Sequence, residues 1–126
     1  ANPLMSQLND NEMIKYLAKL NADDIIQRTK AEIIKHLPDG RASDNIIADS
    51  LHMSSRTLQR KLNENGTTFK KLLTDVRKEL AMKYIQNRQI TLTELSLQLG
   101  FSEVSAFSRA FKQWTGNAPR YYRQSL

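Results

Sequence analysis

Cysteine is absent from this 126-residue chain, and its absence excludes several kinds of chemistry at once. No disulfide, thiolate metal ligand or cysteine nucleophile can form. No apolar run is long enough to cross a bilayer, and no basic flank leads into an apolar stretch at the first residues. Neither a membrane span nor a secretory signal is therefore predicted. These absences fit a protein of the reducing cytoplasm.

The patterns that accompany catalysis are also missing. There is no glycine-rich phosphate loop, no Gly-x-Ser-x-Gly sequence and no nucleophile with a plausible base. His36 and His52 stand alone, without converging carboxylates, and are predicted to be surface or turn residues. We expect no enzymatic activity, no cofactor and no metal site.

Charge is distributed unevenly along the chain. Residues 1–53 carry six Lys or Arg against eight Asp or Glu, whereas residues 54–126 carry thirteen against five. A basic surface of this kind suits a polyanion, because each cation placed on a phosphate releases counterions. The other interpretation is an ordinary solvated surface.

Apolar residues recur at helical spacing, and almost nothing alternates with period two. We predict an all-α fold of about seven helices with an extra N-terminal helix. Ser43, Ser54 or Ser55, and Ser102 are predicted N-caps, and Thr91 with Glu94 reads as a capping box. Helices are expected over residues 10–20 and 22–37, from each of these caps, over 68–87, and from Pro119 onward.

One pattern occurs twice, 49 residues apart: Leu58, Arg60 and Leu62 recur as Phe107, Arg109 and Phe111. The apolar pair makes a buried stripe, and the arginine between its members points away from it. A short helix, a break and a capped helix with an outward arginine is typical of a helix-turn-helix that reads DNA.

The helix predicted over residues 68–87 would connect the two units. Twenty residues give a rise of about 30 Å, while successive major grooves on one side of B-DNA lie about 34–36 Å apart. Such a connector could hold two reading helices one turn apart on one face of the duplex.

The stretch Gly100-Phe-Ser-Glu-Val-Ser-Ala-Phe-Ser-Arg-Ala-Phe-Lys-Gln-Trp-Thr-Gly116, with Pro119 and Tyr122-Arg123 after it, resembles the DNA-binding domain of the AraC/XylS family of bacterial transcription regulators. The spellings Leu37-Pro-Asp-Gly-Arg41 and Gly66-Thr-Thr-Phe69 are similar to a subgroup with a large N-terminal regulatory domain. Some members of that subgroup control amino-acid or ornithine use. Ser96 departs from the family, which usually has alanine there.

The resemblance implies seven helices with two helix-turn-helix motifs. Residues 1–21 would be a linker and N-terminal helix from a preceding domain, and residues 22–126 the DNA-binding domain. Within it we expect the first motif at about residues 43–64, the linker helix at 68–87 and the second motif at 92–115. The implied partners are a double-stranded DNA operator and RNA polymerase. An effector would bind an N-terminal domain absent from this chain, and the isolated domain would be a monomeric part of a nucleoid-associated activator.

Residues expected to reach base edges lie opposite the apolar stripes: Ser55, Arg56, Gln59 and Arg60 in the first motif, and Glu103, Val104, Ser105, Ser108 and Arg109 in the second. Arginine suits guanine, glutamine adenine, and valine a thymine methyl group. Two alternatives stay open. Arg60 could instead form a structural ion pair, and Glu103 could cap its helix rather than accept from cytosine.

Phosphate contacts are expected from a second set: Thr67, Thr68, Lys70, Lys71, Arg120, Tyr121 and Arg123. Such contacts fix register without reading sequence. The aromatic residues Phe101, Phe107, Phe111 and Trp114 are spaced as core residues rather than as a base-stacking surface. The competing functional hypothesis is a helical protein-docking module without DNA specificity, and the two differ in how steeply binding falls with salt.

Overall fold

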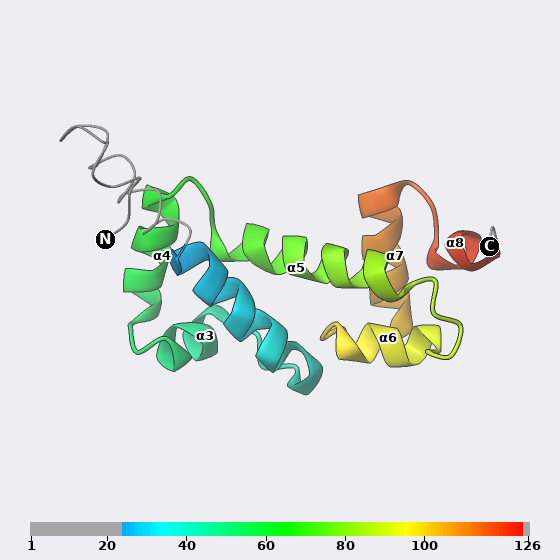
Figure 1. Cartoon of the computed structure of the whole chain (residues 1–126), viewed down its shortest axis with the longest axis horizontal. Coiled ribbons are helices and arrows are strands. Elements are labelled where there is room, and N and C mark those ends of the chain that lie inside the picture. Colours follow the sequence, from blue (N-terminus) through cyan, green and yellow to red (C-terminus); the bar gives the residue numbers. More distant parts are fainter. Residues whose placement is uncertain (1–23, 125–126) are drawn as a thin grey trace, which may run out of the picture.

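A computed structural model describes residues 24–124, and the helix expected over residues 10–20 lies outside them. The described part is all-α and has no strand. It holds a helix over residues 24–36, a 3-10 turn η1 (Leu37–Asp39), α3 (Asp44–Ser50), α4 (Ser55–Glu64), α5 (Phe69–Tyr84), α6 (Leu92–Gln98), α7 (Val104–Thr115) and α8 (Pro119–Gln124). Figure 1 shows an elongated molecule in which α5 joins a unit containing α3 and α4 to a unit containing α6 and α7.

Most of the predicted helix starts are confirmed. The Ser43 Oγ accepts from the Ile46 amide at 3.3 Å, and the Ser54 Oγ accepts from the Thr57 amide at 3.1 Å. Thr91 and Glu94 form the complete capping box, with bonds of 3.0 and 3.3 Å. Each of these bonds satisfies an amide that the first helical turn leaves without a partner.

The start predicted for α7 is wrong. The cap position is Glu103 rather than Ser102, and the Glu103 side chain makes no capping hydrogen bond. Glu103 has an extended backbone, with φ of −156°, and its carbonyl accepts from the Phe107 amide at 3.4 Å. The Glu103 carboxylate therefore does not cap the N-terminus of α7.

Two apolar cores lie at the two ends of α5. The first core is formed by the helix over residues 24–36, η1, α3, α4 and the first half of α5, and includes Ile33, Ile47, Leu58 and Leu62, all fully buried. The second core joins the end of α5 to α6 and α7, with buried Ala81, Ile85, Leu95, Leu99, Phe107 and Phe111. Leu80 packs against both cores. The apolar stripes predicted for α4 and α7 are thus confirmed as core.

The turns of the two helix-turn-helix motifs have the same pattern of backbone hydrogen bonds. The amides of His52 and Met53 donate to Asp49 and Ala48, and those of Gly100 and Phe101 donate to Leu97 and Ser96 in the same order. The second residue after each first helix has a left-handed backbone, with φ of 61° at His52 and 81° at Gly100. His52 is therefore an exposed turn residue, and the repeat seen in the sequence is a repeat of backbone geometry.

Ser96, which stands where the family usually has alanine, is fully buried in the second core. Its hydroxyl donates to the Thr93 carbonyl at 2.8 Å, within its own helix. Because that bond satisfies the hydroxyl locally, the substitution leaves the fold intact.

The linker helix α5 is shorter than the sequence indicated, because it ends at Tyr84 rather than near residue 87. Beyond it the Asn87 Oδ1 accepts from the Gln89 amide at 3.0 Å, a local turn that competes with further helix. Its 16 residues rise about 24 Å.

A third contact region connects the second unit to the middle of α5. The Arg77 Nε donates to the Leu99 carbonyl at 2.8 Å, and its Nη2 donates to the Gly100 carbonyl at 3.3 Å. The guanidinium also lies over the Phe101 ring, 4.4 Å from its centroid. Burial lowers the pKa of Arg77 from its ordinary value, as expected when a cation loses water. Leu37 of η1 reaches the same turn, so the first and second units touch there.

Candidate nucleic-acid interface

The two candidate reading helices lie at opposite ends of the linker helix. In Figure 1, α4 and α7 both cross the direction of α5, and both run from the lower to the upper side of the view. Each is the second helix of a helix-turn-helix and buries one apolar stripe in its own core. Their opposite stripes remain available to a ligand.

Polar side chains on the outer stripe of α4 line a shallow hollow. It is lined by Arg56, Thr57, Gln59, Arg60, Asn63 and Glu64. Three of the predicted base-contact residues therefore lie together on one surface, and Ser55, the first residue of α4, stands half-buried at its end. Asn63 was missed by the sequence analysis, although it lies one helical turn beyond Gln59 and can pair with adenine as glutamine does.

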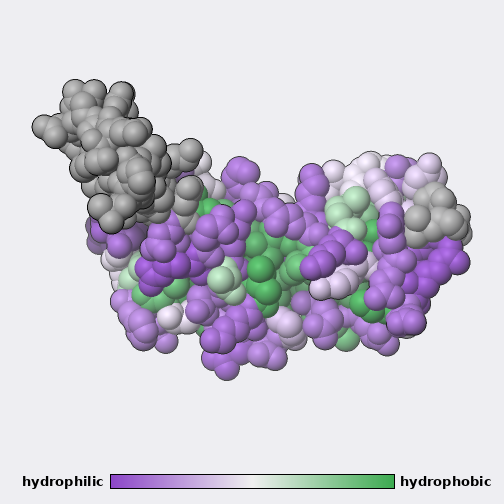
Figure 2. Space-filling view, in the orientation of Figure 1, coloured by the Kyte–Doolittle hydropathy of each residue, from purple (hydrophilic) through white to green (hydrophobic). Residues whose placement is uncertain are grey.

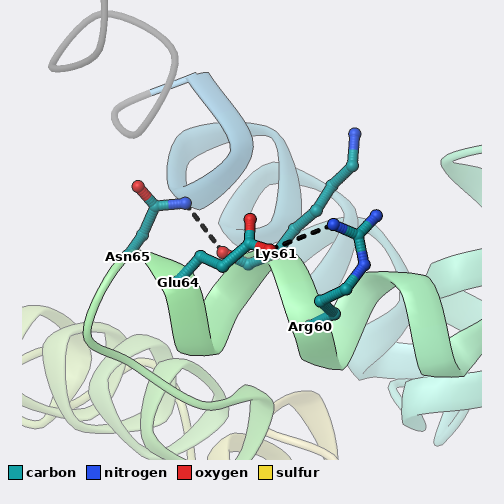
Figure 3. A network of polar contacts seen from close by, with 4 residues as sticks. All are labelled: Arg60, Lys61, Glu64 and Asn65. Atoms are coloured by element: carbon teal, nitrogen blue, oxygen red, sulfur yellow. Dashed lines mark hydrogen bonds and ion pairs between the residues drawn. The ribbon is translucent and has the colours of Figure 1, made fainter.

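Arg60 is held by an ion pair on its own helix. Its Nη1 lies 3.0 Å from the Glu64 Oε1, and both side chains are exposed, as Figure 3 shows. In the same view the Asn65 Nδ2 donates to the Lys61 carbonyl at 2.7 Å and closes the end of α4. The ion pair is the structural alternative left open for Arg60. An exposed pair of this type contributes about 0.3–0.5 kcal/mol, so it would not prevent Arg60 from turning to a base.

A second hollow continues from the α4 face to the start of α5. It is lined by Asp44, Gln59, Asn63, Thr68, Phe69 and Lys70. Thr68 caps α5 by accepting from the Lys71 amide at 3.1 Å, and the Lys71 ammonium pairs with Asp75 at 3.3 Å. Thr67 is half-buried beside this cap. The structure thus brings the predicted phosphate residues Thr68 and Lys70 next to the predicted base residue Gln59.

Asp44 adds a negative charge to this surface. Its Oδ2 accepts from the Gln59 Nε2 at 3.4 Å, which links α3 to the outer stripe of α4. The Gln59 carbonyl oxygen takes no part in that bond and can accept from a base amino group. Asp44 therefore orients a reading residue while opposing the approach of a phosphate.

The five residues predicted for the second motif lie at the cap position before α7 and in its first turns. Glu103, Ser105 and Arg109 are exposed, whereas Val104 and Ser108 are half-buried. Phe107 and Phe111 point the other way, with rings 5.7 Å apart in the second core. Phe101 and Trp114, 6.3 Å apart, pack against the same core. The aromatic residues are thus confirmed as packing residues.

The C-terminal residues predicted to contact phosphate divide into two groups. Arg120 and Tyr121 are exposed. The Arg123 guanidinium instead donates to the Ile85 carbonyl at 2.9 Å and to the Asn87 carbonyl at 3.3 Å, at the end of α5. These bonds give Arg123 a structural task, and its phosphate contact stays a prediction.

Other kinds of site find no support in residues 24–124. No group of three His, Cys, Asp or Glu is placed there to hold a metal ion. None of the helices in that range combines the length and apolar character needed to cross a bilayer. Figure 2 shows a largely hydrophilic face with an apolar area at its centre and smaller apolar areas toward both ends.

The arrangement is that of a double helix-turn-helix domain, a class defined by two such units on one connecting helix. A family described as a helix-turn-helix domain matches residues 47–125. The chain belongs to this family, the AraC/XylS type of transcription regulator.

Individual relatives agree with this assignment. The chain is similar to the ornithine utilization regulator of Pseudomonas aeruginosa, 36% identical over 125 residues, which cover 99% of this chain and 37% of that protein. It is similar to the C-terminal domain of AraT, a response regulator of Geobacillus stearothermophilus, with a TM-score of 0.70 and 29% identity over 81% of this chain and 85% of that one. The fold is also that of the DNA-binding domain of AdpA solved with a target DNA, with a TM-score of 0.65 and 22% identity over 79% of this chain and 90% of that one. The chain spans about two fifths of the length of the Pseudomonas regulator.

Proposed function

We propose that this chain is the DNA-reading part of a bacterial transcription regulator and binds two adjacent major grooves of double-stranded DNA. The observation that carries the proposal is the pair of matching helix-turn-helix units, whose second helices stand at the two ends of one helix. Each second helix buries one stripe and leaves a polar stripe outside, which is how a recognition helix meets a groove. The basic half of the chain, residues 54–126, contains both reading helices.

Base recognition is assigned to the outer stripes. In α4 these residues are Ser55, Arg56, Gln59 and Arg60. In the second motif they are Glu103, at the cap position, and Val104, Ser105, Ser108 and Arg109 of α7. Asn63 joins the first set because it lines the same hollow. Since Glu103 makes no capping bond, its carboxylate can accept from a cytosine amino group.

Phosphate contacts are assigned to residues beside these stripes: Thr67, Thr68, Lys70, Lys71, Arg120, Tyr121 and Arg123. The hollow shared by Gln59, Thr68 and Lys70 supports this assignment, because a base contact and a phosphate contact would then lie next to each other.

The regulator to which this chain belongs would have further partners. Because the chain covers only 37% of the Pseudomonas relative, we place effector binding in a preceding domain and assign residues 1–21 to the linker from it. An activator of this type would act on RNA polymerase, and we propose that partner on the family assignment alone.

The extent of DNA covered tests the two-groove proposal. Duplexes selected from a random pool by this chain, then footprinted, should show one asymmetric site of about 17–20 bp, two groove faces one helical turn apart. Protection of ten base pairs or fewer would mean that one motif docks alone. A perfect inverted repeat bound only by a dimer would also contradict the proposal.

Substitutions separate the base contacts from the phosphate contacts. Arg56→Ala or Gln59→Ala should relax preference at one or two positions, at about 1–3 kcal/mol each. Lys70→Ala should weaken binding to all sequences alike and lower the salt slope by about one. Lys83→Ala, on the exposed side of α5, is the matched control and should change neither. If Arg56→Ala lost equal affinity on selected and random duplexes, the assignment of Arg56 to a base would be wrong.

A further inference from the structure

A partly buried polar contact outside the outer stripes connects α5 to the turn of the second motif. Arg77, Leu37 and the turn residues Leu99, Gly100 and Phe101 meet there, and we call this group the Arg77 joint. It is not part of either outer stripe. It is the place where side chains from the first core touch the backbone of the second motif.

The bonding at the joint is specific to arginine. The carbonyls of Leu99 and Gly100 follow the last residue of α6, where carbonyl groups lack helical partners and the helix dipole is negative. One guanidinium satisfies both carbonyls at 2.8 and 3.3 Å and lies over the Phe101 ring at the same time. Lysine has a charge but neither the planar fork nor the face that stacks.

The joint holds the turn from two directions. Arg77 approaches from α5, and Leu37 approaches from η1, so closely that a methyl group built on Gly100 would lie 3.1 Å from the Leu37 carbonyl oxygen and 3.3 Å from the Arg77 guanidinium. Leu37 is itself buried in the first core. These two contacts on one turn add to the packing of α6 and α7 on Ala81 and Ile85, and together they oppose rotation of α6 and α7 about the end of α5.

The first motif is fixed to α5 in a different way. Leu58 and Leu62 of α4 are fully buried in the same core as Leu72 and Val76 of α5. The orientation of α4 is therefore set by side-chain packing on the first half of α5. α7 also packs on α5, because Phe107 and Phe111 share the second core with Ala81 and Ile85. The Arg77 joint adds a polar contact from α5 to the turn that precedes α7.

We propose that Arg77 is a positioning residue that sets the orientation of α7 relative to α4, and that it does so without touching DNA. In the bound complex this orientation decides whether both reading helices enter their grooves together, a consequence that rests on the proposed function. Each helix-turn-helix would still bind its own half-site after Arg77 is replaced. What would be lost is the additional affinity that comes from holding two binding elements at a fixed separation.

The first test uses no DNA. Because the chain has no cysteine, single cysteines replacing exposed Asn63 on α4 and Gln113 on α7 can carry a spin-label pair, and the distance between the labels can be measured by pulsed electron paramagnetic resonance. The parent chain should give one narrow distribution. Arg77→Ala and Arg77→Lys should both broaden it, while the exposed neighbour Lys78→Ala should not. An unchanged distribution in folded Arg77→Ala, or full rescue by Arg77→Lys, overturns the proposal.

Circular dichroism and the urea midpoint establish that each variant is folded before it is labelled. Should Arg77→Ala fail to fold, Arg77→Lys and Arg77→Gln carry the same test, because each retains an unbranched aliphatic stem with a polar end at this half-buried position. A narrow parental distribution that stays narrow in every folded variant contradicts the positioning role.

The second test uses duplexes selected by the parent chain, together with each half-site alone and with spacers one or two base pairs longer or shorter. In the Arg77 variants affinity for the selected site should fall at least about tenfold, with half-site affinity unchanged and a flatter dependence on spacing. An equal loss on half-sites would make Arg77 a residue of general stability and would refute the proposal. A parent chain that selects no two-part site would refute the two-groove function, while the spin-label result would still decide the role of Arg77.

Discussion

The close approach at Gly100 makes a quantitative prediction about stability. Gly100 and Gly116 both have left-handed backbones, with φ of 81° and 87°. A methyl group added at Gly116 would meet nothing within 4 Å, whereas one at Gly100 would crowd the Leu37 carbonyl and the Arg77 guanidinium. The two glycines therefore share one cost of substitution and differ in a second.

The shared cost is the left-handed conformation, roughly 1–2 kcal/mol for an L-residue. At Gly100 the methyl group must also displace a backbone oxygen from 3.1 Å and a hydrogen-bonded cation from 3.3 Å. Hydrogen bonds to charged groups contribute about 1.5–3 kcal/mol each, so weakening those of Arg77 should add about 1–3 kcal/mol. Gly100→Ala should thus lower the free energy of unfolding by about 2–5 kcal/mol, and Gly116→Ala by about 1–2 kcal/mol.

Urea unfolding of the two variants and of the parent chain, followed by circular dichroism, measures both values. In thermal scans each kcal/mol should appear as a Tm lower by about 4–8 °C for a domain of this size. Equal losses at the two positions would refute the view that Leu37 and Arg77 press on the turn, because only the conformational cost would remain.

Three further predictions concern the caps, the turns and the two motifs. Thr91→Ala should cost about 0.5–2 kcal/mol in urea unfolding because it removes the capping box, whereas Ser102→Ala should stay within about 0.5 kcal/mol; comparable losses would contradict the assigned cap. His52→Gly should raise the free energy of unfolding by up to about 1 kcal/mol, since it relieves the left-handed backbone of a histidine. A lower urea midpoint would argue against strain there. Amides of residues 103–114 should exchange with deuterium more slowly than those of 55–64, because large aromatic side chains bury more apolar area than the leucines of the first motif; the reverse order would contradict that comparison.

Periodicity and capping rules were sufficient for most of the fold. The apolar stripes of α4 and α7 could be predicted because burial imposes a spacing of three or four residues on any helix that packs on a core. Ser43, the choice between Ser54 and Ser55, and the Thr91 capping box were predicted because a short polar side chain before a helix favours capping. The same rule chose Ser102 wrongly for α7. The end of α5 was not predicted correctly, since Tyr84 continues the helical spacing of apolar residues. The turn at Asn87 that follows is held by a local side-chain hydrogen bond, which the spacing of apolar residues does not reveal.

The sequence predicted which residues of the candidate site share an exposed helix face, but not their tertiary contacts. Spacing alone places Arg56, Gln59 and Arg60 opposite the buried leucines, and the same reasoning extended by one turn would have included Asn63. A structural ion pair of Arg60 was the alternative that the family resemblance left open, and the structure shows its partner, Glu64, four positions away on the same helix. No spacing rule reports that Arg123 bonds to the Ile85 carbonyl, since those residues are 38 positions apart and meet only through the tertiary fold.

Arg77 shows most clearly where sequence reasoning ends. On the helical pattern of α5 it is one more basic residue next to Lys78, and nothing in the pattern gives the two residues different roles. In the structure Arg77 lies between the two cores and bonds to two carbonyls of a turn that is geometrically equivalent to the exposed turn at His52. The duplicated turn therefore has two different environments. At His52 a side chain extends into solvent, and at Gly100 the missing side chain leaves room for the contacts from Arg77 and Leu37 that attach the second motif to the first.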